Sequence, residues 1–360
     1  MKRWKEALFA LVFVLVAALL LDLCGAALRP DRHGFGAVWK PYLAEPEDSL
    51  DYLYLGSSLA YCDVNPGLVY DASGLTGYVL AGPEQTLSIT YWYLKEALRT
   101  QSPAYVLIEG TAFRFDRYQD YSQVNIDYMP RSLNRLGATF RAVEPELRTG
   151  LLFPLYFYHS RWKELPVSEA LSALAPGRRD EMKGYTAVEG VTQETGAGPG
   201  LRDMPEEAVY QANLANLAEI LALCRRAGAR PVLVFHPTYS QLSAEARERI
   251  RADVAALDPE TLFFDWSDAF DEIGLAPGQH LYDTGHLNRE GACIFSAWLG
   301  CFLTEALNAS PRTQTEENAA AWRTVAEYWS LPDENTAAGI AGGGVSDMTV
   351  YSHLSMIAFS

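Results

Sequence analysis

Cysteine is scarce in this 360-residue chain, which has only five cysteines. No two of them form a C-x-x-C pair or a spacing typical of metal ligands, so we expect no metal site and no other cofactor. Cys293 and Cys301 fall eight residues apart in one helical pattern, too far along a helix to bridge each other. We interpret these two as small core residues.

Positive charge is also in short supply. The 29 lysines and arginines face 45 aspartates and glutamates, which gives a formal net charge of −16. A surface that binds nucleic acid attracts Lys and Arg, so nucleic acid is excluded as a partner. At 49% hydrophobic and 21% charged residues, the chain is not a disordered protein and can bury a large core.

One long hydrophobic run stands at the N-terminus. It extends from Ala7 to Leu28, is broken only by Asp22, and follows Lys2, Arg3 and Lys5. About 20 apolar residues suffice to cross a bilayer, and a basic flank stays on the cytoplasmic side. We therefore expect an uncleaved single-pass anchor in the cell membrane, with an extracytoplasmic domain after it. The alternative is a cleaved signal peptide, but no A-x-A-like site precedes Arg29.

From Leu50 onward, buried-strand patterns alternate with helical patterns. Helical segments of this length between strands predict βαβ units and a parallel sheet covered on both faces. The expected fold class is α/β with three layers. The predicted strands are residues 50–56, 77–82, 104–110, 229–237 and 261–267, and the main helical segments are 83–103, 205–227 and 289–307.

The alternation is lost in one internal stretch and at the C-terminus. The internal stretch is rich in aromatics, Arg and Pro, and we interpret it as an insertion into the sheet domain. The C-terminal part has one amphipathic helix around 316–329 and is interpreted as peripheral. The predicted division is a cytoplasmic N-terminus at 1–6, a membrane helix at 7–28, a linker at 29–48, the sheet domain at 49–308 with its insertion at about 115–204, and a tail at 309–360.

The first predicted strand ends on Gly56, Ser57 and Ser58. Ligands bind outside the carboxyl ends of strands in parallel α/β sheets, and a glycine there permits a sharp turn. A serine in such a turn attacks a carbonyl only if a base removes its proton. The sequence "YDTGHLNREGA" supplies one, because Asp283 can hold Nδ1 of His286 while Nε2 remains free. Asn288 is placed to cap the following helix.

These two blocks resemble the SGNH/GDSL hydrolase superfamily, whose first block follows strand one and whose D-x-x-H block precedes the last helix. "LGSSLAY" and "DTGHLN" are similar to its membrane-anchored, extracytoplasmic branch, which includes the D-alanylation protein of teichoic acids and cell-surface O-acyltransferase relatives. The resemblance covers about residues 49–113 and 205–307. It implies a triad of Ser58 as nucleophile, Asp283 and His286.

The resemblance also implies an oxyanion hole. Its donors would be the N–H of Ser58 and, from the second block "LAGPEQ", the N–H of Gly82. The third block departs from the family pattern, because "EGTAFRF" has Ala112 near the place of the expected asparagine. Gln85 or Thr111 could supply the missing contact.

Three further residues are weaker candidates for substrate binding. His236 ends a predicted strand, and the alternative is a satisfied strand-end histidine. His159 and Arg161 lie among aromatics in the insertion, and the alternative is plain packing of the insertion onto the domain.

The function that these features favour is a membrane-anchored SGNH-type serine esterase or O-acyltransferase that works through an acyl-serine intermediate. The expected substrate is an acylated cell-surface polysaccharide or a teichoic-acid-like polymer, and a membrane-bound O-acyltransferase is an expected partner. The alternative is a non-catalytic SGNH-like accessory protein that binds a polymer or scaffolds a membrane acyltransferase. The weakened third block favours this alternative, and the intact Ser, Asp and His oppose it.

Overall fold

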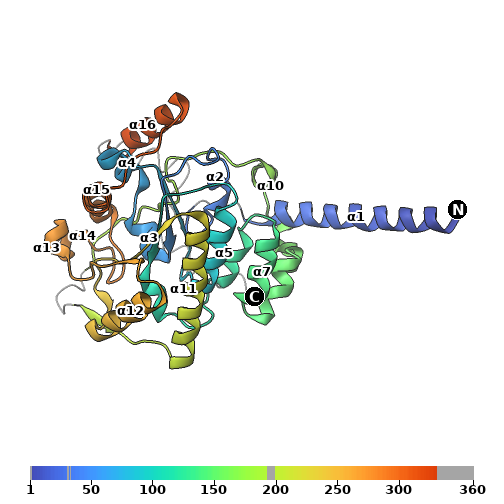
Figure 1. Cartoon of the computed structure of the whole chain (residues 1–360). Helices are drawn as coiled ribbons and strands as arrows, with labels where there is room; N and C mark the ends of the chain where they lie inside the picture. Colours follow the sequence, from blue (N-terminus) through green and yellow to red (C-terminus); the bar gives the residue numbers. More distant parts are fainter. Residues whose placement is uncertain (1, 31, 33, 193–198, 331–360) are drawn as a thin grey trace.

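The computed structural model describes residues 2–30, 32, 34–192 and 199–330 (Figure 1). Its centre is a sheet of five parallel strands in the order β2-β1-β3-β5-β7. The strands are β1 (Tyr52–Gly56), β2 (Gly77–Ala81), β3 (Tyr105–Glu109), β5 (Arg230–Phe235) and β7 (Leu262–Asp265). All five lie within segments predicted to be strands, and the α/β fold class is confirmed.

The strand order reverses at β1. The chain moves from β1 to β2 on one side, and then returns to place β3 on the other side of β1. In sheets of this kind, ligands bind where the order reverses, outside the carboxyl ends of the strands. Gly56 and Glu109 end the two strands that flank this point, so the residues that follow them face the expected site.

Helices cover the sheet on two sides, as Figure 1 shows. α3 (Ser58–Asp63), α4 (Pro66–Ser73) and α15 (Arg289–Glu305) pack together on one side, and α5 (Leu87–Ala97) and α11 (Glu207–Ala227) pack on the other. The strands between them are buried on both faces, which explains their continuous apolar sequences. Three further helices are α12 (Ala244–Leu257), α13 (Phe270–Ile273) and α14 (Pro277–His280).

The predicted insertion folds mostly into short helices. Its elements are α6 (Ser122–Asp127), α7 (Leu133–Arg141), η2 (Pro145–Leu147), α8 (Arg148–Leu152), α9 (Leu155–Tyr158), η3 (His159–Lys163), α10 (Val167–Leu174) and β4 (Gly200–Arg202). α9, η3 and α10 pack against α1 (Lys2–Leu28), while α7 packs against α5. Strand β4 pairs with β6 (Ser240–Leu242) in a separate two-stranded ribbon.

Two further segments join the domain on its periphery. α2 (Trp39–Tyr42) follows α1 and buries Trp39 and Tyr42 in the core. α16 (Glu316–Ser330) packs against α4 and buries Trp322 and Trp329, so this part of the predicted tail is joined to the sheet domain. Residues 331–360 lie outside the described part of the chain.

Candidate active site

The turn after β1 explains why the strand ends on a glycine and two serines. A Cβ at Gly56 would lie 2.4 Å from Cβ of Glu109, so only glycine permits the close approach of β1 and β3 here. Ser57 is buried, and its hydroxyl donates to Oε2 of Glu109 at 2.7 Å. The same hydroxyl accepts the N–H of Leu59 and so caps α3. Ser57 therefore has a structural role, and Ser58 is the next residue along the chain.

The structure brings Ser58, His286 and Asp283 together although 228 positions separate the serine from the histidine. Oγ of Ser58 lies 2.7 Å from Nε2 of His286. Nδ1 of His286 lies 2.9 Å and 3.0 Å from the two carboxylate oxygens of Asp283. This is the arrangement in which an imidazole takes a hydroxyl proton while a carboxylate fixes its tautomer.

The loop that carries Asp283 and His286 is held by several hydrogen bonds. Oδ1 of Asp283 accepts the N–H groups of Gly285 at 2.7 Å and His286 at 2.8 Å. Asn288 caps α15, because its Oδ1 accepts the N–H of Gly291 at 3.0 Å. Its Nδ2 donates to the carbonyls of Gly190 and Gln279, which ties the loop to two other segments.

The pKa values of the pair are shifted apart. Burial alone lowers the pKa of the His286 imidazole, but the hydrogen bond and charge of Asp283 outweigh this effect and raise it above its usual 6.5. Burial alone raises the pKa of Asp283, but its hydrogen bond to His286 outweighs this effect and lowers it. Asp283 is therefore ionised at neutral pH, and His286 holds a proton well once it has taken one.

A second imidazole–carboxylate pair, made by His236 and Asp63, lies beneath this loop. Nδ1 of His236 is 2.8 Å from Oδ2 of Asp63, and its Nε2 lies 2.5 Å from the hydroxyl oxygen of Tyr54. The other carboxylate oxygen of Asp63 accepts the N–H of Leu287, the residue after His286, at 2.9 Å. Burial lowers the pKa of His236 to about 4, so this imidazole is neutral at neutral pH. The pair supports the His286 loop and is closed to solvent.

The two expected oxyanion donors differ in their surroundings. Ser58 is the first residue of α3, so its N–H has no carbonyl acceptor within the helix. The N–H of Gly82 donates to the carbonyl of Gly56 at 3.3 Å. A Cβ at Gly82 would lie 2.0 Å from Oδ1 of Asn125, so a side chain is excluded there. Ser58 thus offers its N–H directly, whereas that of Gly82 is engaged.

Gln85 and Thr111, expected near the substrate, are both buried. The amide nitrogen of Gln85 lies 3.1 Å from the hydroxyl of Thr90 in α5, so this side chain faces the interior. The N–H of Thr111 donates to Oε1 of Glu109. Neither side chain has a hydrogen bond with Ser58 or His286 among the described residues.

Sequence reasoning missed Arg114, which ends η1 (Gly110–Arg114) after β3. Its charge lowers the pKa of His286, although by less than Asp283 raises it. Its Nε is buried with no hydrogen-bond partner among the described residues. Burial lowers the pKa of Arg114, partly offset by the charge of Glu109. The sequence feature that could have pointed to Arg114 is a basic residue in the block after the third strand, where the family asparagine is absent.

His159 and Arg161 lie elsewhere. Both belong to η3, which packs against α1. The guanidinium of Arg161 donates to the carbonyl of Leu28 and to Glu169 of α10. The structure therefore places these two residues at the base of the N-terminal helix and does not bring them to Ser58.

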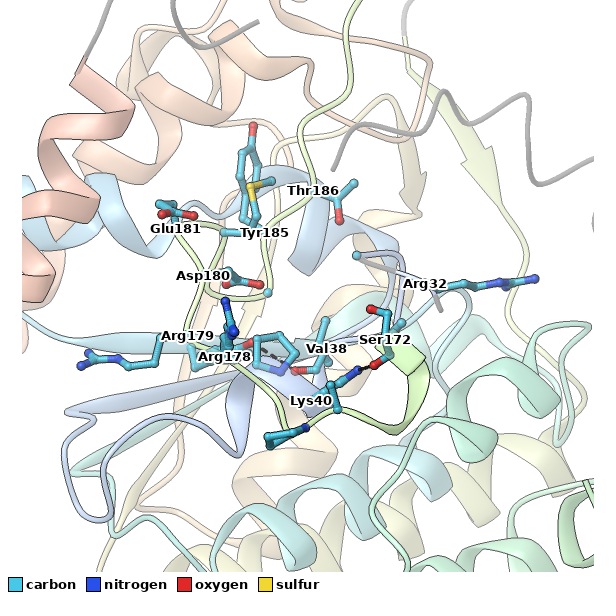
Figure 2. A pocket seen from close by; sticks show the side chains of 18 of the residues that line it. Arg32, Val38, Lys40, Ser172, Arg178, Arg179, Asp180, Glu181, Tyr185 and Thr186 are labelled. Atoms are coloured by element: carbon cyan, nitrogen blue, oxygen red, sulfur yellow. Dashed lines mark hydrogen bonds between the residues drawn. The ribbon is translucent and has the colours of Figure 1, made fainter. Parts of the chain in front are cut away.

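A cavity of about 500 Å³ lies apart from the triad, between α2, α10 and the segment 175–186 (Figure 2). Four labelled basic residues line it. Arg32 precedes α2, Lys40 belongs to α2, and Arg178 and Arg179 follow α10. Nζ of Lys40 donates to the carbonyl of Ser172 at 2.6 Å. None of Ser58, His286 and Asp283 lines this cavity.

Among the described residues, no group of three or more His, Cys, Asp or Glu side chains is arranged to hold a metal ion. None of the five cysteines forms a disulfide. Cys301 is exposed and Cys293 is half-buried, contrary to the expectation that both are core residues, because they lie on the side of α15 that turns away from the sheet.

Comparisons with known proteins give little beyond the fold. No protein family profile matches the sequence, and no curated protein matches it. Among solved structures, the chain is similar to a candidate acylhydrolase from Bacteroides fragilis, with 12% sequence identity and a TM-score of 0.35. The match covers 74% of this chain and 90% of that chain. At this level of likeness, we base no argument about the site on it.

Proposed function

We propose that the chain is a membrane-anchored serine esterase or O-acyltransferase of SGNH type. One observation carries the proposal, namely the contact of Ser58 Oγ with His286 Nε2 at 2.7 Å while Asp283 holds Nδ1. A hydroxyl on a sharp turn at the switch point of a parallel sheet, with a base and an orienting carboxylate, suits acyl transfer. The sequence resemblance supports the same chemistry.

The proposed reaction has two halves. Nε2 of His286 takes the Ser58 proton while Oγ attacks the ester carbonyl carbon. The tetrahedral intermediate collapses, and His286 donates that proton to the departing alcohol oxygen, leaving an acyl group on Ser58. A water or sugar hydroxyl then attacks the acyl carbonyl and gives its proton to His286, and Ser58 recovers it as the acyl–oxygen bond breaks. Water makes the protein a hydrolase, and a sugar hydroxyl makes it a transferase.

The negative charge that develops on the carbonyl oxygen in the transition state has to be stabilised by hydrogen-bond donors. The N–H of Ser58 serves as one donor. The N–H of Gly82 serves as the second once its long bond to Gly56 is exchanged for the oxyanion. We assign the cationic Arg114 to the space left by the missing third-block asparagine. One preorganised donor is worth about 3 kcal/mol of transition-state stabilisation.

Helix α1 and the domain that follows it suggest where in the cell the protein works. The 27-residue α1 is long and apolar enough to cross a membrane. With Lys2, Arg3 and Lys5 on the cytoplasmic side, the domain would be extracytoplasmic and close to acylated cell-envelope polymers. Substrates of this class, with a membrane-bound O-acyltransferase as a partner, form part of the proposal.

Labelling with a fluorophosphonate probe tests the chemistry. The full chain in detergent should react, and Ser58→Ala should lose all labelling and all hydrolysis of a short-chain p-nitrophenyl ester. Ser57→Ala is the neighbouring control, because it removes the Glu109 contact but should keep labelling of the folded fraction. Labelling that survives in Ser58→Ala but not in Ser57→Ala would move the nucleophile by one residue.

The accessory alternative keeps one specific observation in its favour, the engaged N–H of Gly82. It predicts that the wild-type chain fails to react with the probe while still binding an envelope polymer. Protease added to intact cells, after removal of any wall, tests the topology separately. Cleavage beyond Arg29 in intact cells supports an extracytoplasmic domain, whereas cleavage only after lysis contradicts it.

A further inference from the structure

The insertion exposes an unusual number of large apolar side chains. Outside α1, fourteen such side chains are exposed among the described residues, and ten of them lie between 133 and 174. Leu133 is 85% exposed, Val167 75% and Trp162 68%. The ten residues, here called the apolar patch, are Leu133, Leu136, Phe140, Leu152, Phe153, Tyr156, Trp162, Val167, Leu171 and Leu174.

The patch follows helix geometry. Leu133, Leu136 and Phe140 are spaced three and four residues apart on α7, so they share one face. Val167, Leu171 and Leu174 form a similar stripe on α10. A soluble helix normally turns such a stripe toward the core, yet both stripes are exposed. Contiguous exposed apolar surface of this kind marks an interaction site.

The patch surrounds the point where α1 leaves the domain. Figure 1 shows α7 and α10 on either side of the base of α1, and α9, η3 and α10 contact that helix. The exposed apolar part of α1 between its charged residues Glu6 and Asp22 runs from Ala7 to Leu21, 15 residues, and at about 1.5 Å each it spans most of the hydrocarbon core of a bilayer. Asp22 ends this part and pairs with Arg131 just before α7. The bilayer boundary therefore falls at the level of the insertion.

The charge around the patch is opposite to that of the chain. Residues 129–179 carry eight lysines and arginines and four glutamates, a net charge of +4 in a chain whose net charge is −16. A second cavity of about 450 Å³ opens at the base of α1. It is lined by five basic residues and, among the described residues, by no acidic one; the basic residues are Arg29, Arg32, Lys40, Arg131 and Arg135. Three of them form ion pairs with residues outside the lining, Arg29 and Arg135 with Asp127 and Arg131 with Asp22.

We propose that the segment 129–179 is a membrane-docking surface that lies on the bilayer crossed by α1. The apolar patch inserts at the boundary between headgroups and acyl chains, and the exposed basic residues of the segment face anionic lipid headgroups; these are Arg131, Arg141, Lys163 and Arg178. An interfacial surface of this type buries its apolar face by about 5–10 Å. The domain is thereby held flat against the membrane at two places instead of swinging on a single helix. The inference rests on the anchoring part of the proposed function and not on its chemistry.

Spin labels on the full-length chain test this proposal. The chain, with Cys24, Cys293 and Cys301 replaced by alanine, is reconstituted into vesicles of phosphatidylcholine and phosphatidylglycerol at three to one. Single cysteines at Phe153 or Leu171 carry the label, and Leu201 and Leu257 are matched controls, because both are exposed apolar residues outside the patch. Labels in the patch should be several-fold more accessible to oxygen than to a water-soluble nickel complex, and control labels should show the reverse.

Three outcomes are informative. If labels in the patch are as accessible to the nickel complex as the control labels, the proposal is overturned, and the patch would instead bind a protein partner. Insertion that is equal in pure phosphatidylcholine vesicles would overturn the role of anionic headgroups. A label at Val14 reports on α1 itself, so a failure of anchoring is distinguished from a failure of docking. Esterase activity of the labelled chains is measured in parallel and is independent of both results.

Discussion

The protein contains two histidine–aspartate pairs with nearly the same geometry but different surroundings. Nδ1 of His286 lies 2.9 Å from Asp283, and Nδ1 of His236 lies 2.8 Å from Asp63. The side chains of the first pair are 15% and 42% exposed, whereas those of the second are fully buried. The pKa of His286 is raised above its usual value, and that of His236 is lowered to about 4.

The difference shows that an imidazole–carboxylate contact does not by itself identify a catalytic base. What separates the pairs is the partner of Nε2. In His286 it meets the hydroxyl of Ser58, which lies on a sharp turn at the sheet edge. In His236 it meets the hydroxyl of Tyr54, a residue in the middle of β1 with no exposed surface. The first pair is placed to move a proton to a substrate, and the second supports the loop that carries His286.

The strongest test of this comparison is removal of each imidazole. His286→Ala should lower kcat for a short-chain p-nitrophenyl ester by at least about 10⁴-fold, because no other base hydrogen-bonds to Ser58 in the part of the chain that the structure describes. His159→Ala is the matched control, since His159 is exposed in η3 and should leave turnover on this ester near the wild-type value. Near-normal turnover in His286→Ala, or its total loss in His236→Ala with the fold intact, would reverse the roles of the two pairs.

Replacement of the carboxylate sharpens the same comparison through its pH dependence. The base must be neutral, so kcat/KM should rise as pH increases through the His286 pKa, which lies above 6.5. Asp283→Asn should lower kcat by up to about 10⁴-fold, because it favours the wrong tautomer. The midpoint of the remaining activity should move to lower pH, since the group that raises the pKa is gone. An unchanged midpoint would show that Asp283 does not control the imidazole.

The same shift has a consequence for stability. A histidine whose folded-state pKa is raised stabilises the fold fully below its unfolded pKa, and this contribution is lost as pH rises through the folded pKa. The free energy of unfolding should therefore fall slightly above pH 6.5 in the wild type and less so in Asp283→Asn.

The buried pair should respond in stability more than in catalysis. His236→Gln leaves the carboxylate of Asp63 and the hydroxyl of Tyr54 without their shared partner in the core. We expect a loss of about 3 kcal/mol in the free energy of unfolding, measured by denaturant titration of the full chain in detergent. The control, His159→Gln, should change it by no more than about 0.5 kcal/mol. Unchanged stability in His236→Gln would contradict a structural role for the pair.

The sequence predicted those parts of the molecule that are marked by a local pattern of residues. Strands β1 and β2 appear as continuous apolar runs because the sheet is buried on both faces there. Ser58 and His286 were found because each stands at the end of a recognisable element, one after a strand and the other before a helix. Asn288 was also identified as a cap by its position alone, and the structure shows that cap.

Other parts leave no such pattern. Asp63 and Glu109 look like ordinary carboxylates, and their burial becomes visible only when α3 packs against α15 and β3 pairs with β1. Gln85 was expected at the cleft, but the helix that follows it turns its amide inward to Thr90. The short helices of the insertion were missed because each has only a few turns or fewer, and their exposed apolar stripes do not follow a single long period.

The smallest expected effect concerns Asn288, the N-cap of α15, which helps to hold the loop of Asp283 and His286 in place. Asn288→Ala removes the side-chain acceptor of the Gly291 N–H and two bonds to the carbonyls of Gly190 and Gln279. Loss of an N-cap costs about 1 kcal/mol of stability, and the loop with Asp283 and His286 should become less well ordered. We expect a loss of kcat of no more than about tenfold, since Asp283 still accepts the N–H of His286 within the loop.

Asn288→Asp is the conservative control, because it keeps the cap while removing both donor bonds. If it restores stability but not turnover, the bonds to Gly190 and Gln279 position the loop, and if it restores both, the cap alone is sufficient.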